Sequence, residues 1–155
     1  MTEPSRRLVL WVPIFVACCA LSGLFSAAEA ASTKNETRIA LDGYDPVAYF
    51  TDGRPVKGSQ DFTFAFDDAV YYFNGAEHRA MFAADPDRYA PQYAGYCAIG
   101  VSMGMKAHAD PEAWAITDGK LFVFHSKNGV PMFAQDSAAI VKKADANWAT
   151  VRNSP

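Results

Sequence analysis

Cysteine is scarce in this chain of 155 residues, which holds only three. Two of them, Cys18 and Cys19, lie in an apolar run near the N-terminus, so a domain that follows this run has Cys97 alone. One cysteine excludes an internal disulfide. A single cysteine instead suggests a buried thiol, a ligand or an intermolecular bridge.

Runs of basic residues are also absent, and the formal net charge of the chain is −3. Proteins that bind nucleic acid present a positive patch to the phosphates, so this charge balance argues against nucleic acid as a partner. The chain shows no internal repeat, no low-complexity stretch and no internal linker. These absences favour a single domain of roughly 125 residues after the N-terminal segment.

The N-terminal segment has the pattern of a secretory signal peptide. Arg6 and Arg7 precede the apolar run LVLWVPIFVACCALSGLF, and small residues with an Ala-Glu-Ala motif at 28–30 follow it. A basic start, an apolar middle and an Ala-x-Ala site are the three parts of such a peptide. The chain is therefore predicted to be exported, to the periplasm or outside the cell.

We expect residues 1–30 to be removed as the signal peptide, residues 31–40 to form a flexible lead-in, and residues 41–150 to form the domain. The mature protein would then have no membrane segment unless the signal is retained or lipidated. Three alternatives stay open: export by the twin-arginine route, lipidation at Cys18, and retention of the apolar run as a membrane anchor.

Two stretches have the sequence pattern of β-hairpins. Residues 62–73 alternate phenylalanine with smaller residues, turn at Asp-Asp and continue with the β-rich run AVYYF. Residues 112–125 place EAWAIT and KLFVFH on either side of Asp-Gly, a strong signal for a two-residue turn.

Helix signals lie between and after these hairpins. Asp45 and Asp85 each precede a proline, which indicates a short helical turn. Asn74 has a glutamate three residues later, and this capping-box pattern predicts a helix that begins there. Asp136 can cap a last helix with apolar residues on one face. The whole pattern lacks a βαβ rhythm and predicts an α+β fold, a small antiparallel sheet of hairpins with several short helices.

Five segments resemble a known family, the YHS domain proteins, in their small exported single-domain form. They occur in order within residues 42–148: GYDPVAYF, ADPDRYAPQYAGYCA, DPEAW, DGKLF and KADANW. The resemblance implies that residues 41–150 form a YHS-like domain. It also implies a distant similarity to cysteine-rich metal-binding modules attached to some copper-transporting ATPases and metal sensors.

In those modules a strand enters a helix with the pattern YYFCSxxC, and its two cysteines bind a metal ion. The corresponding stretch here is YYFNGAEH, with Asn74 and His78 at the two cysteine positions. The resemblance leaves His78 as the one ligand candidate in this stretch. His78 and His125 both differ from the residues usual in the exported form of the family.

Residues 91–108 hold four soft or metal-ligating side chains: Cys97, Met103, Met105 and His108. Thiolate, thioether and imidazole suit Cu(I) and related ions, although cysteine and methionine also fill ordinary cores. A continuous helix would separate Cys97 and His108 by roughly 16 Å along its axis, too far for one ion. Gly100 and Gly104 favour a break in the helix.

The sequence therefore predicts a metal site that joins Cys97 to a histidine from elsewhere in the fold. His78 is the first candidate, and Met103 or His125 completes the ligand set. The expected ion is copper or iron. A haem is the less favoured cofactor, because no CxxCH attachment motif is present.

Two other functions stay open. A non-catalytic module would hold a small apolar ligand or a partner protein, with Cys97 merely buried, and its small residues would also suit a homodimer. An enzyme would use Cys97 as a nucleophile, a histidine as its base and Asp110 as the orienting acid. No local signature supports catalysis, so the pattern favours a protein that is not an enzyme.

Overall fold

The computed structural model describes residues 38–154 of the chain. The predicted signal peptide, with its export and anchor alternatives, lies outside the described residues. Within the described part, no helix is both long and apolar enough to cross a membrane. Helices and two small sheets alternate there, which confirms the predicted α+β class.

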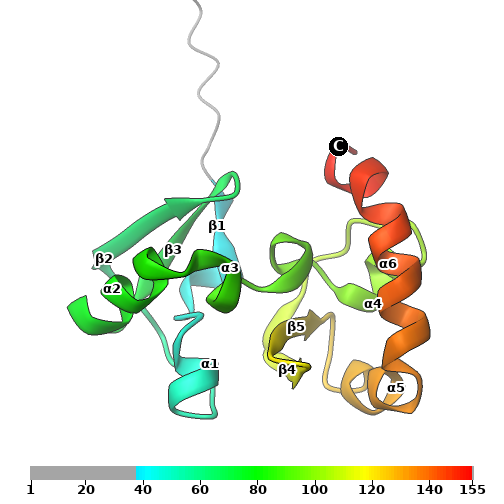
Figure 1. The fold of residues 1–155 in the computed structure, drawn as a ribbon, viewed down its shortest axis with the longest axis horizontal. Coiled ribbons are helices and arrows are strands. Elements are labelled where there is room, and N and C mark those ends of the chain that lie inside the picture. The colour runs from blue at the N-terminus through cyan, green and yellow to red at the C-terminus, as the bar shows by residue number, and fades with distance from the viewer. Residues whose placement is uncertain (1–37, 155) are drawn as a thin grey trace, which may run out of the picture. The chain divides into compact units, whose positions relative to one another are not determined.

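The described elements fall into two successive groups along the chain (Figure 1). The first group contains β1 (Arg38–Ile39), the turn η1 (Ala40–Gly43), α1 (Ala48–Thr51), β2 (Ser59–Phe66), β3 (Ala69–Phe73), α2 (Ala76–Ala84) and α3 (Pro86–Tyr89). The second group contains the turn η2 (Gln92–Gly95), α4 (Ala98–Ser102), β4 (Asp110–Thr117), β5 (Lys120–Phe124), α5 (Gly129–Gln135) and α6 (Ser137–Arg152).

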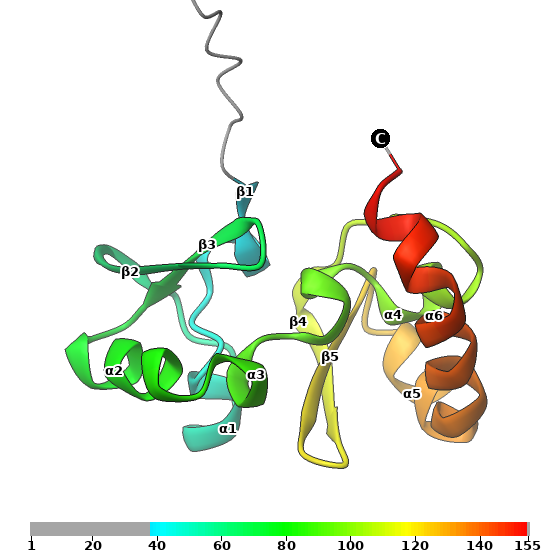
Figure 2. The same cartoon turned by 45° about the horizontal axis from the view of Figure 1, so that its top comes forward.

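Each group has its own sheet. In the first, β3 pairs antiparallel with β2 and parallel with the short β1, so the strand order is β1-β3-β2. In the second, β4 and β5 form a two-stranded antiparallel sheet, and Figure 2 shows them side by side. Regular structure therefore includes Arg38 and Ile39, which lie inside the predicted lead-in, and α6 continues past residue 150.

Both predicted hairpins are confirmed, although each first strand begins earlier than the pattern indicated. Their two-residue turns have positive φ throughout: 50° and 61° at Asp67 and Asp68, and 51° and 71° at Asp118 and Gly119. Two successive positive φ values match the right-handed twist of the flanking strands.

Two of the four predicted caps are confirmed, because Asp85 and Asp136 cap α3 and α6 through their side chains. Asp45 accepts a hydrogen bond from the N–H of Val47, but Val47 is the N-cap of α1 and no side chain caps that helix, so α1 begins later than predicted. The capping box at Asn74 was wrong. Glycine is the N-cap of α2, and the N–H of Asn74 donates instead to Oδ2 of the buried Asp45 (2.9 Å).

The two hairpins share one register. The pairing shifts between Ser59 and Thr63 in the first hairpin, and between Asp110 and Trp114 in the second. Every Cα pair of the first hairpin recurs in the second, 51 residues later. Two unrelated hairpins would not be expected to place the same irregularity at the same position.

The turns that precede the hairpins match as well. In η1 two successive residues have φ of 49° and 48°, in η2 two have φ of 56° and 52°, and each pair is followed by Gly-Tyr. Asp45 follows the first Gly-Tyr and Cys97 the second. The N–H of Asp45 donates to the carbonyl of Val56 (2.8 Å), and the N–H of Cys97 donates to the carbonyl of Ala107 (2.9 Å).

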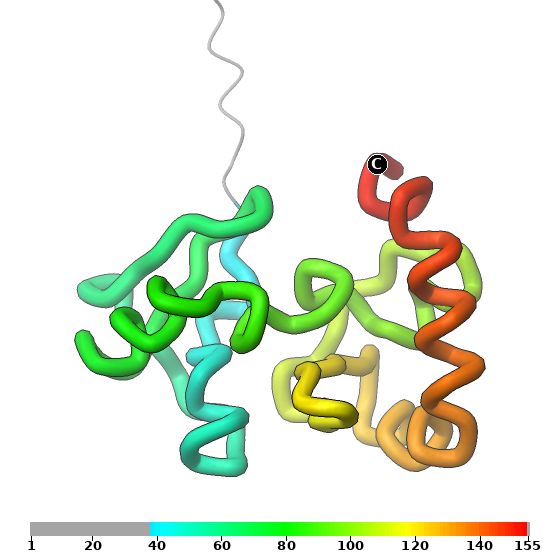
Figure 3. The backbone as a smooth tube through the Cα atoms, viewed as in Figure 1, coloured from blue at the N-terminus to red at the C-terminus, as the bar shows by residue number. Residues whose placement is uncertain are grey.

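The segments that follow the hairpins complete the match. MFAAD and MFAQD, which begin at Met81 and Met132, each end in an aspartate that caps the next helix. We call residues 40–89 the first repeat and residues 92–152 the second repeat. Figure 3 traces the chain through them in succession. The prediction of no internal repeat was therefore wrong.

Two apolar clusters are buried: one centres on the first repeat, and the other lies mainly in the second repeat but includes Leu41 and Tyr49 of the first. Phe82 lies in the first cluster, with its ring centroid 5.2 Å from that of Phe73. Its counterpart Phe133 lies in the second cluster, 5.0 Å from Phe124. Burial of one such side chain contributes about 1.5–3 kcal/mol, so each repeat has an aromatic centre that holds its helix on its hairpin.

Candidate functional site

The second repeat contains a pocket of about 250 Å³ that brings several soft side chains together. Its described lining includes one thiol, one imidazole and three thioethers: Cys97, His125, Met103, Met105 and Met132. They come from the start of α4, the loop after α4, the end of β5 and α5. Three of the four predicted ligand candidates, Cys97, Met103 and His125, are thus in one place.

The backbone after α4 builds one side of this pocket. The helix ends at Ser102, and the chain reverses at Gly104, whose φ is 79°. The N–H of Met105 then donates to the carbonyl of Gly100 (2.9 Å). A Cβ on Gly100 would lie 2.9 Å from the Cβ of Ala107, so only glycine allows this loop to return so closely. The predicted break in the helix is present.

Cys97 is the most buried of the soft side chains, with 4% of its surface exposed. It is a free thiol at the N-cap of α4, and its Sγ accepts a hydrogen bond from the N–H of Gly100 (3.4 Å). This contact fixes the sulfur at the pocket wall. Cys97 therefore has both the access to the pocket and the support from the backbone that a ligand needs.

His125 follows β5 directly and is exposed. Its Nδ1 lies 3.1 Å from the carbonyl oxygen of His108. A carbonyl can only accept, so the hydrogen is on Nδ1, and in the neutral ring Nε2 keeps its lone pair. Metal-bound histidines typically donate their other N–H to a carbonyl or carboxylate in this way.

The structure places His78 in the first repeat, outside this pocket. Its Nδ1 lies 2.7 Å from Oδ2 of Asp45, which is fully buried. That carboxylate also accepts from the N–H groups of Val47 (2.8 Å) and Asn74 (2.9 Å). His125, rather than His78, therefore lies with Cys97 in the described lining of this pocket, because Asp45 holds the His78 ring in the first repeat.

Asp45, His78 and Thr51 lie in a row in which an acid contacts an imidazole and the imidazole contacts a hydroxyl. Such a row can activate a nucleophile. Nε2 of His78 lies 3.4 Å from Oγ1 of Thr51. The same hydroxyl is closer to a carboxylate oxygen of Asp52 (2.8 Å) and also reaches the carbonyl of Val47 (3.2 Å). Its single hydrogen has better acceptors than His78, so this cluster ties α1 to α2 and supports no nucleophile.

The remaining predicted candidates lie apart from the pocket lining. Nε2 of His108 is 3.2 Å from a carboxylate oxygen of Asp42. The carboxylate of Asp110 accepts from the N–H of Glu112 (2.9 Å), and no hydrogen bond between described residues joins it to a histidine. The acid that an enzyme would need beside its base is therefore not Asp110.

Over residues 38–154, no three histidine, cysteine, aspartate or glutamate side chains gather in a way that could hold a metal ion. The donors that line the pocket are mostly of another kind. Methionine sulfur supplies three of the five soft donors, beside one thiol and one imidazole. The sequence showed Met103 and Met105 as part of a row, whereas Met132 was missed because it lies far along the chain.

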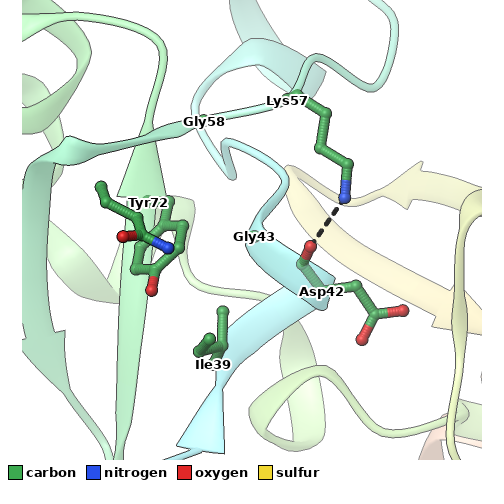
Figure 4. A pocket seen from close by; sticks show the side chains of 7 residues that line it. Ile39, Asp42, Gly43, Lys57, Gly58 and Tyr72 are labelled. Carbon is green, nitrogen blue, oxygen red and sulfur yellow. Dashed lines mark hydrogen bonds between the residues drawn. The ribbon is translucent and has the colours of Figure 1, made fainter.

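A second pocket, of about 350 Å³, lies in the first repeat (Figure 4). Lys57 reaches across it and donates from Nζ to the carbonyl of Asp42 (2.8 Å). Its ammonium also lies 4.2 Å from the centre of the Tyr44 ring. Tyr72 and Ile39 stand on the other side of the pocket. The Lys57 ammonium thus holds the η1 turn, and the described lining of this pocket contains no cysteine, histidine or methionine.

Three tyrosines are neutral far into the alkaline range. Burial raises the pKa of Tyr49 and of Tyr93 well above the ordinary value, and at Tyr93 a hydrogen bond to Asp145 adds to the effect. Burial also raises the pKa of Tyr71 to about 12. The Tyr49 hydroxyl donates to the carbonyl of Pro111 (2.9 Å) and so links the two repeats.

Comparison of the chain with family models, curated proteins and solved structures found no match. The resemblance to YHS domains therefore stays a prediction.

Proposed function

We propose that this chain is an exported domain of the YHS type that binds a soft transition metal ion, copper before iron, in the pocket of the second repeat. The main support is that Cys97, Met103 and His125 line one pocket although they come from separate segments. The hydrogen bond from His125 to a carbonyl supports the same conclusion, because it leaves Nε2 available.

Each of these residues has a distinct role in the proposal. Cys97 would lose its proton and supply an anionic sulfur, His125 would supply a neutral nitrogen, and Met103 a thioether. Thiolate and thioether together select Cu(I) over harder ions, which places copper before iron. Bound metals need their ligands within about 2 to 2.3 Å, so side chains must close around an ion in a pocket of 250 Å³.

A haem fits the pocket less well than a single ion. The volume of about 250 Å³ is below the roughly 300–1,000 Å³ of pockets that hold drug-sized ligands, and haem is a large member of that class. His125 or Cys97 could reach a haem iron only if the loops around the pocket opened. The proposal therefore concerns an ion.

Native mass spectrometry of the full-length gene product, recovered from the exported fraction without added metal, tests this function. We expect a mass excess equal to one copper ion, or one iron ion, that is lost in Cys97→Ser. The same spectrum measures the N-terminus. A mature chain that begins at residue 31 would support export with cleavage after the Ala-Glu-Ala motif.

Met81→Leu is the matched control, because Met81 is the counterpart of Met132 but lies in the first repeat. It should keep the metal. A chain that carries no metal, and that also leaves added Cu(I) with a competing chelator, would contradict the proposal.

A small apolar ligand is the second candidate occupant, because hydrophobic side chains form most of the pocket wall. Benzene is a suitable probe, since it enters dry apolar cavities of similar size. Under this alternative, Cys97→Ala leaves benzene binding unchanged and the wild-type protein binds no Cu(I). Under the metal proposal, Cys97→Ala abolishes Cu(I) binding.

A further inference from the structure

Three methionines are exposed around the mouth of the pocket. Met103, Met105 and Met132 have 61%, 51% and 55% of their surfaces exposed, and they are three of the five large apolar side chains exposed among the described residues. Exposed apolar side chains scattered singly are normal, but a cluster at one pocket indicates a binding role.

The backbone holds these methionines at the mouth from two directions. Gly104 separates Met103 from Met105 at the point where the chain reverses, so both belong to the loop beside the pocket. Met132 belongs to α5. This helix packs closely on β5 at Gly129, where a Cβ would lie 2.7 Å from the Cβ of Phe124. The rim therefore rests on fixed backbone, while its side chains are free to turn.

The sulfur donors of the pocket range from exposed, neutral thioethers at its mouth to the buried thiol of Cys97. Methionine is neutral, polarisable and has three rotatable side-chain bonds, so it can bind an ion in solvent and turn inward with it. Cys97 lies below at 4% exposure. Neutral thioethers bind soft monovalent ions without losing a proton, whereas hard ions prefer oxygen ligands.

We propose that Met105 and Met132 join Met103 in a thioether rim that captures monovalent Cu(I) from solvent and passes it to Cys97 and His125. This inference rests on the proposed function and adds two ligands and a route of capture to it. Ion transfer here exchanges ligands only: each sulfur donates an electron pair, and the one proton released comes from the Cys97 thiol.

Methionine-methyl NMR of the full-length chain, labelled with ¹³C at the methionine methyls, tests the rim. Ag(I) is the probe, because it has the soft monovalent character of Cu(I) and is not oxidised in air. We expect the signals of Met103, Met105 and Met132 to shift on addition of one equivalent. The signal of Met81, on α2 in the first repeat, should not shift.

Substitution adds an affinity measurement. The double variant Met105→Leu with Met132→Leu keeps the size of the side chains and removes both sulfurs, at little cost in stability because both positions are exposed. Loss of outer-shell partners alone changes metal affinity by about 10–100-fold, so we expect at least about a tenfold loss of Ag(I) affinity. Met81→Leu should leave the affinity within about twofold.

The outcomes separate the rim from the function on which it rests. If only the Met103 methyl responds to Ag(I), the rim is overturned and the metal site at Cys97 stands. If none of the three methionines responds and Cys97→Ser leaves the Ag(I) affinity unchanged, both are overturned. A shift of all three rim signals that persists in Cys97→Ser, with a lower Ag(I) affinity, would show that the rim binds the ion without the thiol, as capture before transfer requires.

Discussion

The two repeats have the same pattern of turns and hairpin pairing, but the side chains at matching positions build a closed polar cluster in the first and an open pocket in the second. Asp45 and Cys97 both follow a Gly-Tyr turn, both are buried, and both donate their N–H to a returning strand of chain. Asp45 is closed off by the ring of His78. The residue 51 positions after His78 is Gly129, which has no side chain and lines the soft pocket. In the first repeat the imidazole of His78 covers the buried carboxylate. In the second repeat Gly129 has no side chain at the equivalent position, and the pocket is open there.

Under the proposed function, one scaffold serves stability in the first copy and metal binding in the second. In the first repeat the acid at the turn accepts three hydrogen bonds, from two backbone N–H groups and from His78. In the second repeat the thiol accepts one, from Gly100. A group with its bonds satisfied holds the fold together, whereas a group with spare capacity beside a pocket is available to a ligand.

The largest effect should come from removal of the acid. Asp45→Ala would leave two buried N–H groups and His78 without their acceptor, and we expect it to lower the free energy of unfolding by about 3–5 kcal/mol. Urea denaturation followed by circular dichroism measures this loss. Cys97→Ala, at the matching position, should cost clearly less because it removes one weak hydrogen bond. Equal losses in the two variants would contradict the comparison.

The two histidines should separate binding from stability. We expect His125→Ala to weaken Cu(I) binding at least about tenfold, because it removes a proposed ligand, with little change in stability at an exposed site. His78→Ala should lower the stability of the fold and leave the Cu(I) affinity unchanged. Competition with a chromogenic Cu(I) chelator measures the first quantity and urea denaturation the second. A loss of Cu(I) affinity in His78→Ala alone would return the site to the pairing predicted from the sequence.

A smaller effect should come from the close approach beneath the pocket. Gly100→Ala would place a Cβ 2.9 Å from that of Ala107, and we expect a loss of about 1–3 kcal/mol in stability. The second substitution Ala107→Gly should restore much of it. The single variant Ala107→Gly is the control, because with Gly100→Ala it completes a double-mutant cycle. Thermal unfolding of the four proteins tests whether overlap at Ala107 is the cause.

Local patterns in the sequence predicted most of the elements. Alternating apolar residues and tight-turn residues gave both hairpins, and aspartate at a helix start gave the caps at Asp85 and Asp136. These signals act over a few residues, where sequence and backbone conformation are directly linked. Asn74 failed as a cap because a distant carboxylate, from Asp45, takes its N–H.

The repeat and the pocket depend on distance along the chain and were harder to predict. The two copies share few identical residues, chiefly Gly-Tyr at the turns and Met-Phe-Ala before the capping aspartate, and these become informative only with their spacing of about 51 residues. Cys97, Met103 and His125 were predicted from donor chemistry alone. Which histidine shares a pocket with Cys97 is decided by the fold, and it is His125 rather than the first candidate, His78.

The smallest effect concerns a hydroxyl that distinguishes the two cores. Tyr71 is fully buried, and its hydroxyl has no hydrogen-bond partner among the described residues, whereas the residue 51 positions later is Phe122. A buried hydroxyl without a partner costs about 1–3 kcal/mol, so we expect Tyr71→Phe to raise stability by about 1 kcal/mol. Urea denaturation at neutral pH measures the gain. Lower stability would mean that the hydroxyl has a partner, such as a water molecule.

The same variant has a signature at high pH. The pKa of Tyr71 is 10.0 in the unfolded chain and about 12 in the folded protein, so between these values the folded state keeps a proton that the unfolded state has lost. The stability from this group is therefore complete below pH 10 and falls as the pH rises toward 12. In Tyr71→Phe the fall should be shallower, although Tyr49 and Tyr93 still contribute to it. If the fall of stability with pH is the same in Tyr71→Phe as in the wild type, Tyr71 ionises as readily in the folded state as in the unfolded state.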